Sequence, residues 1–119
     1  MRHGAILLIL PLLLASCRDG PLPTGDGEVQ RVEAGRRIYE RKCASCHGPL
    51  GDGNTVTASK FPYANLIDGV WRSEGTPEVI ERQIREGRDP MPKFEGKLTD
   101  EEIRQTVSFV LELSRQGPP

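Results

Sequence analysis

Residues 43–48, with the sequence CASCHG, place two thiols three positions apart and an imidazole directly after the second. Such residues can close a disulfide, bind zinc, exchange thiols or attach a cofactor. A structural zinc site needs four ligands, and no second Cys/His pair stands beside Cys43, Cys46 and His47 in the mature domain. A thioredoxin-type pair should follow a strand in a βαβ unit, whereas the pattern before Cys43 is helical. A structural disulfide would close a very small loop and leave His47 without a role.

The remaining interpretation of this segment is covalent heme attachment, for which Cys-x-x-Cys-His is the signature. The thiols of Cys43 and Cys46 can add to two neighbouring vinyl groups at the edge of the macrocycle. His47 then offers an imidazole nitrogen to the iron as the proximal ligand, and Gly48 lets the backbone turn close to the ring. The sequence therefore predicts one covalently attached heme c.

Met91 is the candidate for the opposite axial position, which in a cytochrome c domain is taken by Met or a second His. The other histidine, His3, and the other methionine, Met1, lie in an N-terminal stretch that we expect to be removed. Met91 is flanked by prolines, which stiffen its loop. Ligation by His47 and Met91 fills both positions and raises the reduction potential relative to two histidines. This predicts an electron carrier without a small-molecule substrate, and not an enzyme.

The N-terminal stretch has the order of a secretory signal over residues 1–16. Arg2 is followed by an apolar run and then by small residues, and the run is too short for a membrane span of about 20 residues. The residues LASC that end at Cys17 resemble the lipobox of bacterial lipoproteins, which implies lipidation of Cys17. Residues 17–27 are rich in Gly and Pro and are expected to be a flexible tether, followed by a cytochrome c domain over residues 28–115. These features predict an exported protein held by lipid on the periplasmic or extracytoplasmic side of a bacterial membrane.

Composition limits the other function classes. The net charge of the 119-residue chain is −1, which gives no basic field for nucleic acid. Apolar residues make up 36% of the chain, a small core for a domain of this size, and such domains often depend on a cofactor.

Three helices are predicted from periodicity and capping. Residues 28–42 carry an apolar stripe that leads into Cys43. A second helix begins after Thr76, with Pro77 in its first turn, and ends at Gly87. A third begins at Thr99, which has Glu102 at capping-box spacing. Residues 48–75 show no sustained period, which suggests that this stretch wraps something other than its own side chains. The expected stripes are Val32, Gly35, Ile38, Tyr39 and Cys43 in the first helix, and Ile103, Thr106, Val107, Phe109, Val110, Leu111 and Leu113 in the last.

These motifs together resemble class I cytochromes c, in particular the short bacterial monoheme kind and the heme domains attached to terminal oxidases. The resemblance covers residues 29–113 and implies an all-α fold, with three to four helices wrapped around one covalent heme. It implies that Gly35 and Tyr39 of the first helix meet Phe109 and Val110 of the last. Trp71 would pack near the heme propionates or serve as an ordinary core residue.

One position departs from the family pattern. The family usually has proline where this chain has Ala64, and there a backbone carbonyl holds the N–H of the proximal imidazole. Which residue supplies that carbonyl here is open, with Pro49 and Pro62 as the other candidates.

Electron transfer between respiratory membrane complexes, or service as the heme subunit of one, is the function that these observations favour. The partners would be redox proteins that meet the exposed heme edge. Arg36, Arg37, Arg41 and Lys42 could form part of that surface or could be a solvated helix face. The alternatives are a heme enzyme or gas sensor with a labile sixth ligand, and a thiol oxidoreductase without heme.

Overall fold

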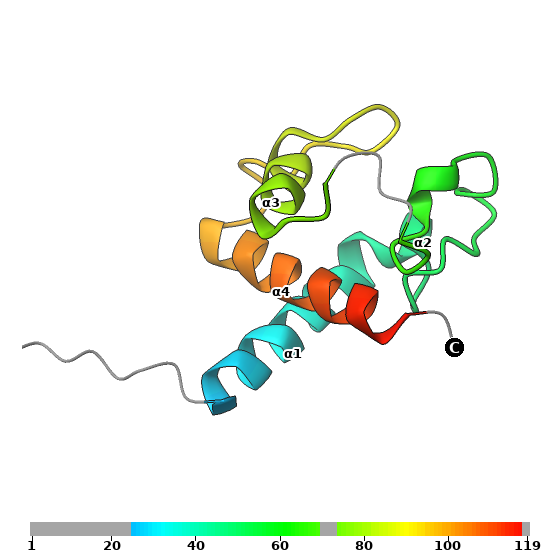
Figure 1. The fold of residues 1–119 in the computed structure, drawn as a ribbon. Coiled ribbons are helices and arrows are strands. Elements are labelled where there is room, and N and C mark those ends of the chain that lie inside the picture. Colours follow the sequence, from blue (N-terminus) through cyan, green and yellow to red (C-terminus); the bar gives the residue numbers. More distant parts are fainter. Residues whose placement is uncertain (1–24, 70–73, 118–119) are drawn as a thin grey trace, which may run out of the picture.

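The computed structural model describes residues 25–69 and 74–117 (Figure 1). These residues form α1 (Gly25–Lys42), α2 (Ala44–His47), the 3-10 helix η1 (Pro62–Ala64), α3 (Pro77–Glu86) and α4 (Asp100–Gln116). Within these ranges, extended pairing is limited to two isolated bridges, so the predicted all-α class is confirmed. The predicted signal, Cys17 and Trp71 lie outside the described residues.

Helix α1 begins at Gly25, three residues before the predicted start. Asp26 and Glu28 lie in its first turn, where carboxylates stabilise the positive end of the helix dipole. Residues 25–27, which we expected in the tether, are therefore helical. This first turn was not predicted, because two of its residues are glycines and glycine is a poor helix former.

Helices α1 and α4 cross closely, as Figure 1 shows. At the crossing, a Cβ atom on Gly35 would overlap the backbone carbonyl of Gln105, so only glycine permits this approach. One turn later the rings of Tyr39 and Phe109 pack edge to face, with centroids 5.1 Å apart and an interplanar angle of 60°. The predicted meeting of Gly35 and Tyr39 with the last helix is thus confirmed.

The predicted caps of α3 and α4 are present. The Thr76 hydroxyl accepts the Val79 N–H at 3.4 Å. The Thr99 hydroxyl accepts the Glu102 N–H at 3.2 Å, and the Glu102 carboxylate accepts the Thr99 N–H at 2.8 Å. These bonds satisfy N–H groups that a helix start otherwise leaves without partners.

An ion-pair bridge joins α3 to α4 on either side of the loop that carries Met91. Arg85, one-quarter exposed, binds the Glu81 carboxylate at 2.6 Å on its own helix and the Asp100 carboxylate at 2.7 Å on the next. Beneath it lies one continuous core from α1, α3, α4 and the connecting segments. Its buried members are Tyr39, Leu66, Ile67, Ile80, Ile84, Phe94, Ile103, Val107, Phe109, Val110 and Leu113. Among the described helices, none is long and apolar enough to cross a membrane.

Candidate cofactor site

The Cys-x-x-Cys-His segment forms a tight turn directly after α1. The Cys43 N–H donates to the Tyr39 carbonyl at 2.8 Å, which continues the helix by one residue. The His47 N–H then donates to the Cys43 carbonyl at 2.9 Å and closes the single turn of α2. Cys43, Cys46 and His47 are therefore brought together by local backbone bonds, as their spacing predicted. Both thiols are free, and all three side chains are partly buried.

The electrostatics of Cys43 do not suit thiol exchange. Burial, followed by the proximity of Cys46, raises the pKa of the Cys43 thiol to about 11. Reactive thiol pairs need a lowered pKa, because the thiolate is the nucleophile. Cys43 instead remains protonated at neutral pH, which disfavours the thiol oxidoreductase alternative.

His47 is oriented by a carbonyl from a distant segment. Its Nδ1 lies 2.8 Å from the Ala64 carbonyl oxygen. Since a carbonyl can only accept, Nδ1 carries the proton and the lone pair lies on Nε2. Burial lowers the pKa of His47, partly offset by this bond, so the imidazole is neutral at pH 7, as a metal ligand must be. The acceptor that the sequence left open is therefore Ala64 and not Pro49 or Pro62.

Three further bonds hold backbone carbonyls of the motif and of Gly48, which follows it. The buried Tyr39 hydroxyl donates to the Gly48 carbonyl at 2.8 Å, and burial raises the pKa of Tyr39, which keeps it a donor. The Thr55 hydroxyl donates to the Cys46 carbonyl at 3.0 Å, and the Gly53 N–H donates to the His47 carbonyl at 2.8 Å. Thr55 and Gly53 were not predicted from the sequence, because no motif around either residue indicates that it binds a carbonyl of residues 43–47.

Met91 lies in a tight loop between α3 and α4, partly buried against the core that Cys43 also borders. Its N–H and carbonyl exchange bonds of 2.7 and 2.9 Å with Arg88. Gly87, with φ of +67°, gives this loop room, since a Cβ there would lie 2.7 Å from the Met91 carbonyl oxygen. The sequence predicted Gly87 only as a helix end. The Met91 sulfur accepts a weak hydrogen bond from Gln83 Nε2 at 3.7 Å.

The chain's own atoms fit a covalent heme. Two free thiols and a neutral imidazole with an available Nε2 lie on one turn, and a thioether borders the same core. In the described part of the chain, no group of three or more His, Cys, Asp or Glu side chains is placed to hold a metal ion by itself. Cys43 and Cys46 would hold the macrocycle through thioether bonds, and His47 and Met91 would be the candidate ligands of the iron.

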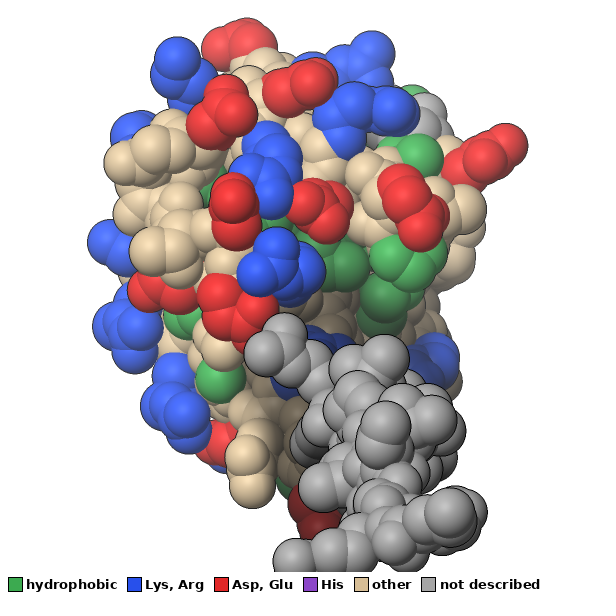
Figure 2. Space-filling view, turned by 90° about the vertical axis from the view of Figure 1, so that its left-hand side faces the viewer, with side chains coloured by type: hydrophobic (Ala, Val, Ile, Leu, Met, Phe, Trp, Pro, Cys, Tyr) green, Lys and Arg blue, Asp and Glu red, His purple; other side chains and the backbone are tan. Residues whose placement is uncertain are grey.

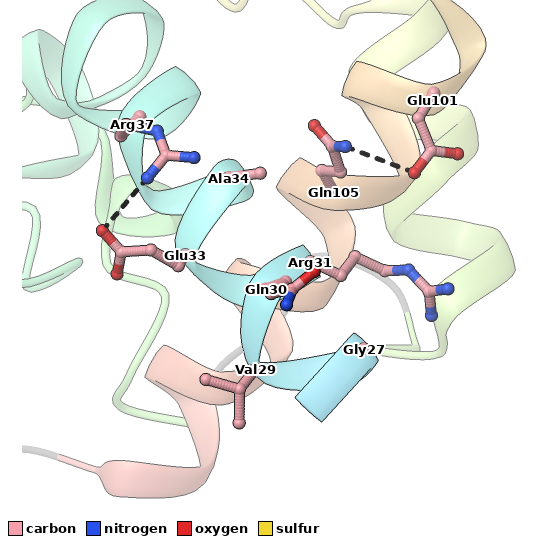
Figure 3. Close-up of a pocket in the computed structure, with 9 residues that line it drawn as sticks. All are labelled: Gly27, Val29, Gln30, Arg31, Glu33, Ala34, Arg37, Glu101 and Gln105. Carbon is pink, nitrogen blue, oxygen red and sulfur yellow. Dashed lines mark hydrogen bonds and ion pairs between the residues drawn. The ribbon is translucent and has the colours of Figure 1, made fainter. Parts of the chain in front are cut away.

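A surface hollow elsewhere does not belong to this site. Figure 3 shows it between the first two-thirds of α1 and the first two turns of α4. Its lining includes charged side chains such as Glu33, Arg37 and Glu101, and no residue of the Cys-x-x-Cys-His motif.

The surface charges are mixed in sign. Figure 2 shows acidic and basic side chains interspersed over one face of the molecule. On α1, Arg36 binds the Glu33 carboxylate at 2.9 Å and Arg37 approaches it to 3.4 Å. Both arginines are exposed and pair with a carboxylate of their own helix, in ion pairs of the weak kind found on helix surfaces.

Comparisons with known proteins identify a matching family and similar proteins. Residues 30–110 match the family described as "Cytochrome C oxidase, cbb3-type, subunit III". Cytochrome c6 of Synechococcus elongatus is 32% identical over 85 residues, which cover 70% of this chain and 91% of that protein. Cytochrome c6 of Parathermosynechococcus lividus is 31% identical over 83 residues, with coverage of 70% and 91%. The solved structure of cytochrome c6 from the diatom Phaeodactylum tricornutum superposes with a TM-score of 0.61 at 31% identity, covering 72% of this chain and 97% of that one.

Proposed function

Because the chain belongs to the class I monoheme cytochromes c, and is thus an electron carrier with one covalent heme c, we propose that His47 and Met91 are its axial ligands. Cys43 and Cys46 form the two thioether bonds. When bound, heme c supplies an iron that alternates between ferric and ferrous states. With both axial positions filled by the protein, electrons pass to and from redox protein partners and no substrate reaches the metal.

One observation carries this assignment: the 2.8 Å hydrogen bond between His47 Nδ1 and the Ala64 carbonyl, on the same turn as two free thiols. It fixes the tautomer in which Nε2 is the ligand atom and fixes the plane of the ring. The partly buried Met91, in a loop held by Arg88 and Gly87, supports the thioether as the second ligand.

The ligand assignment is tested with protein produced together with a heme-attachment system. Heme should remain on the chain in denaturing electrophoresis. In Met91→Ala, we expect ferrous protein to bind carbon monoxide and ferric protein to lose its weak near-infrared thioether band. Leu98→Ala is the matched control, since Leu98 is another partly buried loop residue against the same core. Carbon monoxide binding by the unsubstituted protein would contradict a filled sixth position.

The cellular setting is a further part of the proposal. We place the domain of residues 28–115 outside the cytoplasm, held by lipid on Cys17 through residues 17–27, after removal of residues 1–16. Its partners would be respiratory membrane complexes, to which it delivers electrons or belongs as a heme subunit; the match to a cytochrome oxidase subunit family supports this setting. We expect Cys17→Ser to move the cytochrome from the membrane to the soluble fraction. The lipid itself is tested by metabolic labelling with a radioactive fatty acid, and absence of label from the unsubstituted protein would refute the lipid anchor.

A further inference from the structure

Residues 55–64 contain three hydrogen-bonded turns in series, each joining residues three positions apart. The Ala58 N–H donates to the Thr55 hydroxyl at 3.0 Å. The Phe61 N–H donates to the Ala58 carbonyl at 2.8 Å, and the Ala64 N–H donates to the Phe61 carbonyl at 2.9 Å. We call residues 55–64 the turn series; it ends in η1.

Both ends of the turn series bind the heme motif, at neighbouring residues. At its start, the Thr55 hydroxyl donates to the Cys46 carbonyl at 3.0 Å. At its end, the Ala64 carbonyl accepts the His47 Nδ1–H at 2.8 Å. The turn series is therefore connected to the motif at both ends, through the Cys46 carbonyl at its start and through the His47 imidazole at its end.

We propose that the turn series positions the His47 imidazole, and that Thr55 is a positioning residue at the end of the series opposite to Ala64. The direction of the Ala64 carbonyl sets the plane of the ring, and on the N-terminal side of Ala64 that direction is held by these turns. The inference rests on the proposed function, because it takes His47 as the axial ligand.

The alanine at position 64 provides the last hydrogen bond of the turn series. A proline, which the family usually has there, lacks an N–H and could not donate to the Phe61 carbonyl. Proline instead fixes its own φ through its ring. Ala64 has no such restriction, and its N–H joins it to the turn series.

Thr55 is required for its hydroxyl, which donates to one group and accepts from another. Serine can do both, whereas valine has nearly the same shape and can do neither. Thr57 provides a matched control, because it lies in the same loop and its side chain is exposed. The variants are Thr55→Val, Thr55→Ser and Thr57→Val, with Thr55→Ala in parallel because it removes the hydroxyl without a second γ-methyl.

The measurement is the solvent exchange rate of the His47 Nδ1 proton, followed by NMR in the reduced holoprotein. Amide protons of Tyr39 and Val110 in the core serve as an internal reference for global opening. We expect Thr55→Val and Thr55→Ala to speed Nδ1 exchange about tenfold, equivalent to about 1.4 kcal/mol. Thr55→Ser and Thr57→Val should stay within about twofold of the unsubstituted protein, and the core amides should not change.

A second arm separates transmission through the turn series from a direct effect of Thr55 on the neighbouring Cys46. In an Ala64→Pro background the link to Phe61 is absent, so Thr55→Val should no longer speed Nδ1 exchange.

Three outcomes would overturn the inference: unchanged exchange in both Thr55→Val and Thr55→Ala, an equal acceleration of the core amides, or an undiminished effect in the Ala64→Pro background. Failure of the proposed function is distinct, since the unsubstituted protein would then lack attached heme or a bound His47 imidazole.

Discussion

Substitution of Gly35 by alanine should destabilise the protein through one added methyl group. The Cβ would overlap the Gln105 carbonyl and lie 2.5 Å from its carbonyl carbon and 3.0 Å from Phe109 Cβ. The first two atoms belong to the backbone of α4, which cannot rotate away as a side chain would. Helix α4 would have to move off α1, which loosens the contact between Tyr39 and Phe109.

The magnitude is the difference of two opposing effects. Overpacking a core typically costs about 1–3 kcal/mol, and the backbone obstacle places Gly35→Ala at or above the upper end. Alanine gains about 0.5–1 kcal/mol over glycine inside a helix. We therefore expect a net loss of about 2 kcal/mol in the free energy of unfolding. For a domain of this size, that lowers Tm by roughly 8–16 °C.

The assay is thermal and denaturant unfolding of the oxidised holoprotein, followed by far-ultraviolet circular dichroism. Gly27→Ala is the control, because Gly27 lies in the same helix and a Cβ atom on it would meet nothing within 4 Å. We expect Gly27→Ala to match or slightly exceed the stability of the unsubstituted protein. If Gly35→Ala were equally stable, the two helices would not be in the close contact on which this reasoning depends.

Three other outcomes are expected. Tyr39→Phe should lower the free energy of unfolding by about 1–3 kcal/mol, measured by denaturant titration, because the Gly48 carbonyl loses its donor; unchanged stability would contradict this. Thr99→Ala should cost about 1 kcal/mol in the same assay through loss of the α4 cap, and Thr99→Ser should recover most of it. The bonds from Thr99 lower the pKa of Glu102 below its ordinary value of 4.5, so its stabilisation is complete above that pH and is lost as the pH falls through the lowered pKa. Tm should therefore drop less between pH 5 and pH 3 in Glu102→Gln than in the unsubstituted protein, and equal drops would refute this role.

The helices were predictable because their signals are local. Thr76 with Pro77, and Thr99 with Glu102, are caps in which the interacting groups lie within four residues of each other. The stripe of α4 was also predicted, except that Leu111 is only partly buried. The start of α1 was missed, because the glycine at position 25 gives no helical signal.

The candidate ligands could be proposed from the sequence, whereas the hydrogen bonds that hold them in place could not. Cys43, Cys46 and His47 are recognised by spacing, and Met91 by elimination of the other candidates. The Ala64 carbonyl and the Thr55 hydroxyl act on residues 17 and 9 positions away. Every residue has a carbonyl, so the sequence alone could not choose among acceptors in a segment without periodicity.

The ion pairs of Arg85 restrain the loop between α3 and α4. Asp100 is held to α3 by one of these ion pairs, and the Phe94 N–H donates to the Ile84 carbonyl at 3.0 Å. Residues 84–94 are thereby a short closed segment whose two ends are fixed to each other, and a short closed loop has little conformational entropy to gain on release. If Met91 binds the heme iron as proposed, a thioether that dissociated from the iron would therefore stay nearby at a high effective concentration.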